Sequence, residues 1–103
     1  MYQSISMDEF YQKSKRESIA IIDVREADEY DNGYIVGAKN LPLSILTENA
    51  NSLNKATNYY IVCQSGGRSA QACAYLADKE KLAVTNVMGG MSTWKGEIVH
   101  EKL

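Results

Sequence analysis

The sequence predicts an α/β fold with a central, mostly parallel sheet and helices on both of its faces. Short apolar segments rich in β-branched residues alternate with segments of helical periodicity along the chain. The apolar segments are continuous rather than alternating, which is typical of strands covered on both faces. Strands that alternate with helices form parallel sheets, because each helix returns the chain to the end of the sheet where the previous strand began.

The composition is that of a small globular domain. The chain has 103 residues, 45% of them apolar, with 13 acidic and 11 basic side chains. We expect a single domain over residues 1–103, because about 100 residues can bury a core and no linker or repeat divides the chain. A net charge of −2 gives no reason to bind nucleic acid or an anionic membrane.

Neither a membrane span nor a secretory signal is expected. The longest apolar run covers five residues, 59–63, against roughly 20 needed to cross a bilayer. Residues 1–5 have neither the basic n-region nor the apolar h-region of a secretory signal. Two cysteines and one histidine are too few for a disulfide framework or a zinc site. We therefore expect no metal and a reducing, cytoplasmic compartment.

The chain begins with a helix and a strand. Ser6 and Glu9 have the spacing of a capping box, which predicts a helix over residues 7–15. Residues 18–24 (SIAIIDV) are mostly apolar and rich in β-branched side chains, as expected of a buried strand.

Two weaker helical segments follow. Residues 26–32 predict a short helix with acidic side chains near its N-terminus and Gly33 at its end. We interpret its acidic cluster as a solvated helix face; the alternative is a docking site for a basic partner. Residues 43–53 predict another helix, although asparagine and threonine lower its helix propensity.

The second half repeats the alternation. Residues 58–62 predict a buried strand, residues 69–81 a long helix, residues 83–87 a last strand and residues 91–95 a short helix. The inner face of the long helix is predicted to consist of Ala72, Cys73, Leu76 and Ala77. On that face, Cys73 is interpreted as a buried hydrophobe, and a resolving thiol is the alternative.

The loop between the second strand and the long helix has the composition of an anion-binding site. Its residues are Cys63, Gln64, Ser65, Gly66, Gly67, Arg68 and Ser69. Parallel sheets place functional loops at the carboxyl ends of strands, where Cys63 lies. Gly66 and Gly67 permit positive φ, which lets successive N–H groups face an anion, and the helix N-terminus adds its dipole. Arg68 adds a permanent cation.

Cys63 is the candidate nucleophile of this loop. The N–H groups, the helix N-terminus and Arg68 are expected to lower its pKa from about 8.5 into the ~3.5–7.5 range of activated cysteines. The only histidine, His100, lies in the C-terminal tail, so a Cys–His pair is not expected. A lone cysteine at a strand end is usually a small buried hydrophobe; the complete loop favours a reactive thiolate.

Four segments resemble, in order, the signatures of the rhodanese family of sulfurtransferases. They are Asp23-Val24-Arg25-Glu26 with Glu29-Tyr30, residues 33–42, the loop 63–69 and residues 87–94. In the loop, four residues separate Cys63 from Arg68, and a serine follows. The family usually has a histidine where this chain has Tyr34, whose hydroxyl is the candidate brace of the Asp23 loop.

The resemblance implies a rhodanese-like fold and a sulfurtransferase of the thiosulfate:cyanide type, with no cofactor. Cys63 would take sulfane sulfur from thiosulfate or a persulfide donor, and its persulfide would pass the sulfur to a thiol or cyanide. The N–H groups of residues 64–69 would bind substrate and persulfide, and Arg68 would attract a small anionic donor. Asp23 and Arg25 would orient the loop by ion pairing, with an ordinary surface pair as the alternative.

Two other functions use the same residues. A persulfide carrier or interaction module would deliver the sulfur of Cys63 to a partner protein. A cysteine phosphatase or arsenate reductase also uses a cysteine, an N–H cradle and an arginine. Its loop, however, places one residue more between cysteine and arginine than this chain does, so this hypothesis is the weaker one.

Overall fold

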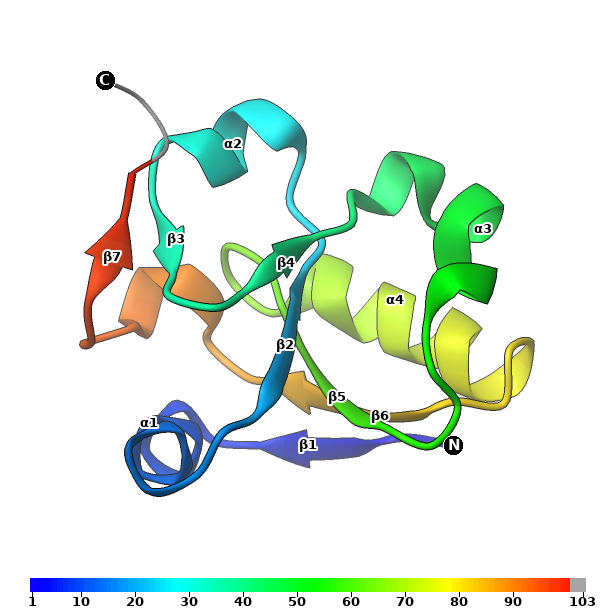
Figure 1. Cartoon of the computed structure of the whole chain (residues 1–103), viewed down its shortest axis with the longest axis horizontal. Helices are drawn as coiled ribbons and strands as arrows, with labels where there is room; N and C mark the ends of the chain where they lie inside the picture. The colour runs from blue at the N-terminus through cyan, green and yellow to red at the C-terminus, as the bar shows by residue number, and fades with distance from the viewer. Residues whose placement is uncertain (101–103) are drawn as a thin grey trace.

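The computed structural model, which describes residues 1–100, contains a five-stranded parallel sheet (Figure 1). The strand order is β1-β6-β5-β2-β4, and each neighbouring pair is parallel. The strands are β1 (Gln3–Ile5), β2 (Ala20–Asp23), β4 (Lys39–Asn40), β5 (Asn58–Val62) and β6 (Ala83–Val87). A separate antiparallel pair consists of β3 (Tyr34–Ile35) and β7 (Ile98–Val99).

Helices lie on both faces of the sheet, so the predicted fold class is confirmed. They are α1 (Met7–Arg16), α2 (Ala27–Asp31), α3 (Leu46–Asn49) and α4 (Gly67–Asp78), with 3-10 turns η1 (Leu43–Ile45), η2 (Ala50–Ser52) and η3 (Gly90–Thr93). None of the helices described is long and apolar enough to cross a membrane. The hydroxyl of Ser6 accepts a hydrogen bond from the N–H of Glu9 at 3.1 Å, so α1 begins at the predicted cap.

Residues 91–95, predicted as a short helix, lie partly in the 3-10 turn η3 (Gly90–Thr93), and two longer predicted helices also differ from the observed ones. Residues 43–53 form three short turns, η1, α3 and η2, instead of one helix. Here Asn49 and Ser52 bond to backbone carbonyls, which competes with regular helix geometry. Helix α4 ends before residue 81, because Lys81 adopts a left-handed φ of 57° and the N–H of Leu82 bonds back to the carbonyl of Leu76.

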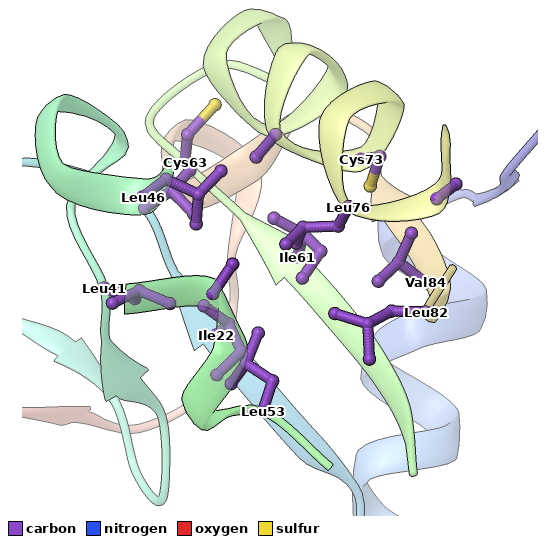
Figure 2. Packing of buried hydrophobic residues seen from close by; sticks show 14 residues of the cluster. Ile22, Leu41, Leu46, Leu53, Ile61, Cys63, Cys73, Leu76, Leu82 and Val84 are labelled. Carbon is purple, nitrogen blue, oxygen red and sulfur yellow. The ribbon is translucent and has the colours of Figure 1, made fainter. Parts of the chain in front are cut away.

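The core consists of two layers, one on each face of the sheet. Successive side chains of a strand point to opposite faces, so Ile22 and Ile61 pack under α3 and α4 (Figure 2), whereas Ile21 and Tyr60 pack against α1. All four predicted inner-face residues of α4 are buried. The strands β1, β3, β4 and β7 were not predicted, because segments of two or three residues carry no periodic pattern.

Candidate active site

The candidate site lies where β2 and β5 end side by side. Asp23 is the register partner of Val62, and the N–H of Val24 donates to the carbonyl of Val62 at 2.9 Å. The two loops selected from the sequence, after Val24 and after Val62, are therefore neighbours at one edge of the sheet. Cys63 is the first residue after β5, and its side chain is buried, with 1% exposed.

The sulfur of Cys63 is surrounded by hydrogen-bond donors from the loop. The N–H of Gly66 donates to Sγ at 3.1 Å and the N–H of Ser69 at 3.2 Å. Gly66 has a φ of 107°, which turns the loop around the sulfur. The prediction of positive φ is wrong for Gly67, which is the first residue of α4. One left-handed residue is enough, because the helix itself orients the N–H of Ser69.

These hydrogen bonds make the pKa of Cys63 differ from that of Cys73, the second thiol of the chain. Burial raises the pKa of Cys63, but the hydroxyl of Ser69 and the N–H groups of Ser69, Gly66 and Ser65 outweigh it, so the pKa lies below its ordinary value. Burial raises the pKa of Cys73 to about 12, and no comparable donors offset it. Cys73 is fully buried in the core and, like Cys63, is a free thiol.

Ser69 is fixed by a residue that sequence reasoning missed. The hydroxyl of Ser69 lies 3.4 Å from Sγ of Cys63 and 3.1 Å from the carbonyl of Gly66. It donates to Oδ1 of Asn86, in the neighbouring strand β6, at 2.5 Å. The signal available in the sequence was an amide within the predicted strand 83–87. Asn86 thus connects the loop to the sheet.

Arg68 is bound by Glu29, a residue of the acidic helix α2. Nη1 of Arg68 lies 2.6 Å from Oε1 of Glu29, and Nη2 lies 2.9 Å from Oε2. The hydrogen bond from Arg68 lowers the pKa of Glu29 to about 2. The interpretation of the acidic cluster as only a solvated face is therefore wrong for Glu29. Because the two residues are 39 positions apart in the sequence, no local pattern could reveal the pair.

Asp23 and Arg25 form a second, buried ion pair at 2.9 Å, so the surface-pair alternative is wrong. Arg25 also donates to the carbonyl of Gly33 at 2.7 Å. The amide of Asn40 donates to the carbonyls of Asp23 and Arg25, both at 2.9 Å. These bonds fix the segment from which α2 begins. The pair is thus bonded to the segment that carries Glu29, and its predicted role in orienting the Cys63 loop stays a prediction.

Tyr34 packs against Tyr30, a residue of helix α2. Its ring stacks on that of Tyr30, with centroids 4.0 Å apart and an angle of 10° between the rings. The hydroxyl of Tyr30 donates to the carbonyl of Ala38 at 2.5 Å. The contact of Tyr34 that fixes α2 is thus an aromatic stack, and the role of its hydroxyl stays a prediction.

The turn η3 is hydrogen-bonded to the backbone of the Cys63 loop. The N–H of Met91 donates to the carbonyl of Cys63 at 2.8 Å, and the N–H of Ser92 to that of Gln64 at 2.9 Å. Gly90 has a φ of 56°, and a Cβ at this position would collide with the carbonyl of Cys63. The resemblance places Gly90 in a family signature but gives no physical reason for a glycine there. In the structure the reason is the close approach of its backbone to that of Cys63.

Within residues 1–100, no three histidine, cysteine, aspartate or glutamate side chains are grouped so as to hold a metal ion. The arrangement is instead a low-pKa sulfur in a cradle of N–H groups, with an ion pair at its rim. Such a sulfur can act as a nucleophile, and the cradle can hold the anion that forms on it.

Comparisons with known proteins agree with this geometry. Residues 6–97 match the family model for rhodanese-like domains. A Bacillus subtilis protein named "Putative sulfur carrier protein YrkF" is 39% identical over 94 residues, which are 90% of this chain and 51% of that protein. The chain thus spans about half the length of that relative. The thiosulfate sulfurtransferase GlpE of Coxiella burnetii is 30% identical over 95 residues, 92% of this chain and 89% of that protein.

Solved structures match over nearly the whole chain. A rhodanese-like domain protein from Staphylococcus aureus has a TM-score of 0.89 and 38% identity, and the match covers 97% of this chain and 99% of that one. A rhodanese-related protein from Thermoplasma volcanium has a TM-score of 0.88 and 32% identity, covering 97% of this chain and 100% of that one.

Proposed function

This chain belongs to the rhodanese-like domain family, and on that premise we propose that it is a sulfurtransferase that carries sulfane sulfur as a persulfide of Cys63. One observation carries the proposal: the buried sulfur of Cys63 accepts hydrogen bonds from the N–H groups of Gly66 and Ser69. These donors lower the pKa of the thiol against the effect of burial, which favours the nucleophilic thiolate.

In the first step the thiolate of Cys63 attacks the outer sulfur of a thiosulfate or persulfide donor. A bond forms between the two sulfur atoms, and the donor's own sulfur–sulfur bond breaks. The leaving group is sulfite from thiosulfate or a thiol from a persulfide. The charge then lies on the outer sulfur of the Cys63 persulfide, which the N–H groups of residues 64–69 are proposed to hold.

In the second step a thiol or cyanide acceptor attacks the outer sulfur, and Cys63 leaves as a thiolate. A low pKa makes a thiolate a better leaving group, so the hydrogen bonds that activate Cys63 also favour its release. The two steps share one covalent intermediate and therefore predict ping-pong kinetics. A carrier would use the same steps with a partner protein as acceptor, and the relative named as a sulfur carrier favours this second candidate.

The phosphatase alternative is less consistent with the site. Phosphate-binding arginines use their guanidinium fork for the phosphate oxygens. In this chain the fork of Arg68 is occupied by the carboxylate of Glu29 at 2.6 and 2.9 Å.

Two further expectations accompany the proposal. Residues 1–103 are proposed to act as one domain, since both core layers pack on the same sheet. The cytoplasmic location stays a prediction.

The test is the mass of the intact protein after incubation with thiosulfate or with a thiol persulfide. We expect the wild type and C73A to gain the mass of one sulfur atom and C63A to gain none. Cyanide should then remove the added sulfur and release thiocyanate. If neither donor adds sulfur to Cys63, the proposed function is wrong.

A further inference from the structure

The only cation of the Cys63 loop is already neutralised. Both terminal nitrogens of Arg68 are bonded to the two carboxylate oxygens of Glu29, at 2.6 and 2.9 Å. This bidentate geometry is the strongest form of an arginine–carboxylate pair. The pKa of Glu29, about 2, keeps its carboxylate ionised at neutral pH. The pair therefore presents almost no net charge to an approaching donor.

The surroundings of the loop add negative rather than positive charge. The other residues of the loop carry no charged side chain. Arg25, the nearest cation on the adjoining segment, is buried in its own pair with Asp23. Helix α2 and its cap contribute the further carboxylates of Glu26, Asp28 and Asp31. The positive field at the sulfur thus comes from backbone N–H groups and the N-terminus of α4.

We propose that Glu29 determines the donor specificity of Cys63 by neutralising Arg68, so that the site takes sulfur from a persulfide in preference to the thiosulfate dianion. This inference rests on the proposed function. Thiosulfate carries two negative charges, and its approach gains most from a free cation and loses most from nearby carboxylates. A persulfide, R–S–SH, presents its outer sulfur without a second anionic group attached to it.

The transfer from a persulfide balances without any other reactant. The thiolate of Cys63 attacks the outer sulfur of R–S–SH, a new sulfur–sulfur bond forms, and the sulfur–sulfur bond of the donor breaks. The released R–S⁻ takes the proton of the persulfide and leaves as R–SH. The products are the Cys63 persulfide anion and a thiol, and the sulfane sulfur keeps its oxidation state.

The chain offers a matched pair of variants for the test. Glu29 has a second role, in which Oε1 accepts the N–H of Glu26 at 3.0 Å and caps α2. Glutamine serves equally in a capping box, so E29Q keeps the cap and removes the charge that neutralises Arg68. Asp28 is exposed and precedes Glu29 in the same helix. D28N therefore makes the same change in net charge without releasing Arg68.

The experiment measures the second-order rate of sulfur loading onto Cys63, by intact mass, with three donors. Thiosulfate is the dianion, glutathione persulfide has an anionic carrier, and cysteamine persulfide has a cationic one. Alkylation by iodoacetamide at the same pH corrects each variant for its fraction of thiolate, and thermal melting confirms that the variants are folded.

We expect the wild type to load faster from cysteamine persulfide than from thiosulfate. E29Q should raise the thiosulfate rate about tenfold and change the cysteamine persulfide rate less than about twofold, with glutathione persulfide between them. D28N should change each rate less than about twofold, because an exposed charge is screened by solvent and salt. Added salt should raise the thiosulfate rate of the wild type and lower that of E29Q.

Three results would overturn the inference: faster loading of the wild type from thiosulfate than from both persulfides, equal effects of E29Q and D28N, or no change of selectivity in E29Q. Each of these three results is compatible with the proposed persulfide of Cys63. Failure of the proposed function is a different result, namely no loading of Cys63 from any of the three donors.

Discussion

Cys63 lies just before helix α4 and Cys73 within it; both are buried, with 1% and 0% of their surfaces exposed, but their environments differ (Figure 2). Cys63 lies where β5 meets the N-terminus of α4, and two N–H groups donate to its sulfur. Cys73 lies on the inner face of α4 among core side chains. Burial raises the pKa of both thiols, and only for Cys63 do hydrogen bonds reverse the direction. Oriented donors, rather than exposure, therefore distinguish the reactive thiol.

The largest expected difference is in alkylation of the two thiols at neutral pH. The pKa of Cys73 is about 12 and that of Cys63 lies below 9.0, so Cys63 should react about 1,000-fold faster or more, because the thiolate is the nucleophile. Mass spectrometry of iodoacetamide-treated C63A and C73A gives the two rates. Comparable rates in native protein would mean that the hydrogen bonds do not set the reactivity.

The next effect is on the backbone that holds Cys63 in place. G90A should lower the free energy of unfolding by about 2–4 kcal/mol, since alanine at a φ of 56° is strained and its Cβ meets the carbonyl of Cys63. G67A is the control: apart from its chain neighbours and the backbone of α4, no atom lies within 4 Å of an added Cβ, and α4 should gain up to about 1 kcal/mol. Urea unfolding of both variants measures this, and a stable G90A would contradict the close approach.

A third effect appears in the pH dependence of stability, to which the two thiols contribute with opposite signs. The depressed pKa of Cys63 stabilises the fold above the unfolded value of about 8.5, and this contribution is lost as pH falls through the folded pKa. The raised pKa of Cys73 stabilises the fold below about 8.5, and this contribution is lost as pH rises toward about 12.

The measurement is the slope of unfolding free energy against pH in each single variant relative to wild type. C63A should lose a rising limb below about pH 8.5, and C73A a falling limb above it, each of at most about 1.4 kcal/mol per pH unit. Slopes that change in the same direction in both variants would show that the thiols do not differ as described.

The smallest expected effect concerns the hydroxyl of Ser69. It has one proton, which it donates to Asn86 at 2.5 Å, while the Cys63 thiol donates to its oxygen at 3.4 Å. Removal of Asn86 leaves that proton to the carbonyl of Gly66 at 3.1 Å and to the thiolate, so N86A should lower the pKa of Cys63 by less than about one unit. S69A should raise the pKa, because a hydrogen bond that lowers it is lost.

The absorbance of the Cys63 thiolate in a C73A background, followed as a function of pH, gives both values. In the double variant S69A/N86A the second substitution should have no effect, because the hydroxyl through which Asn86 acts is absent. An unchanged effect of N86A in the S69A background would contradict this role of Asn86.

Those parts of the fold that local patterns encode were predicted well. The strands at 58–62 and 83–87 have the predicted bounds, and α1 begins at the predicted cap. The loop between Cys63 and Ser69 was also recognised, because the strand, the glycines and the helix that form the cradle are contiguous in sequence. Residues 43–53 were harder, since side chains that bond to the backbone divide one expected helix into three turns.

The sequence alone determined the family, the parallel sheet and Cys63 as the candidate nucleophile, because each is encoded by residues close together in the chain. Only the tertiary structure decided which partners these residues have. Glu29 and Asn86 approach Arg68 and Ser69 from other elements, and Gly90 lies against the carbonyl of Cys63. Such contacts depend on how distant segments pack; here one pairs the charge of Arg68 with a carboxylate and another sets the direction of the Ser69 hydroxyl.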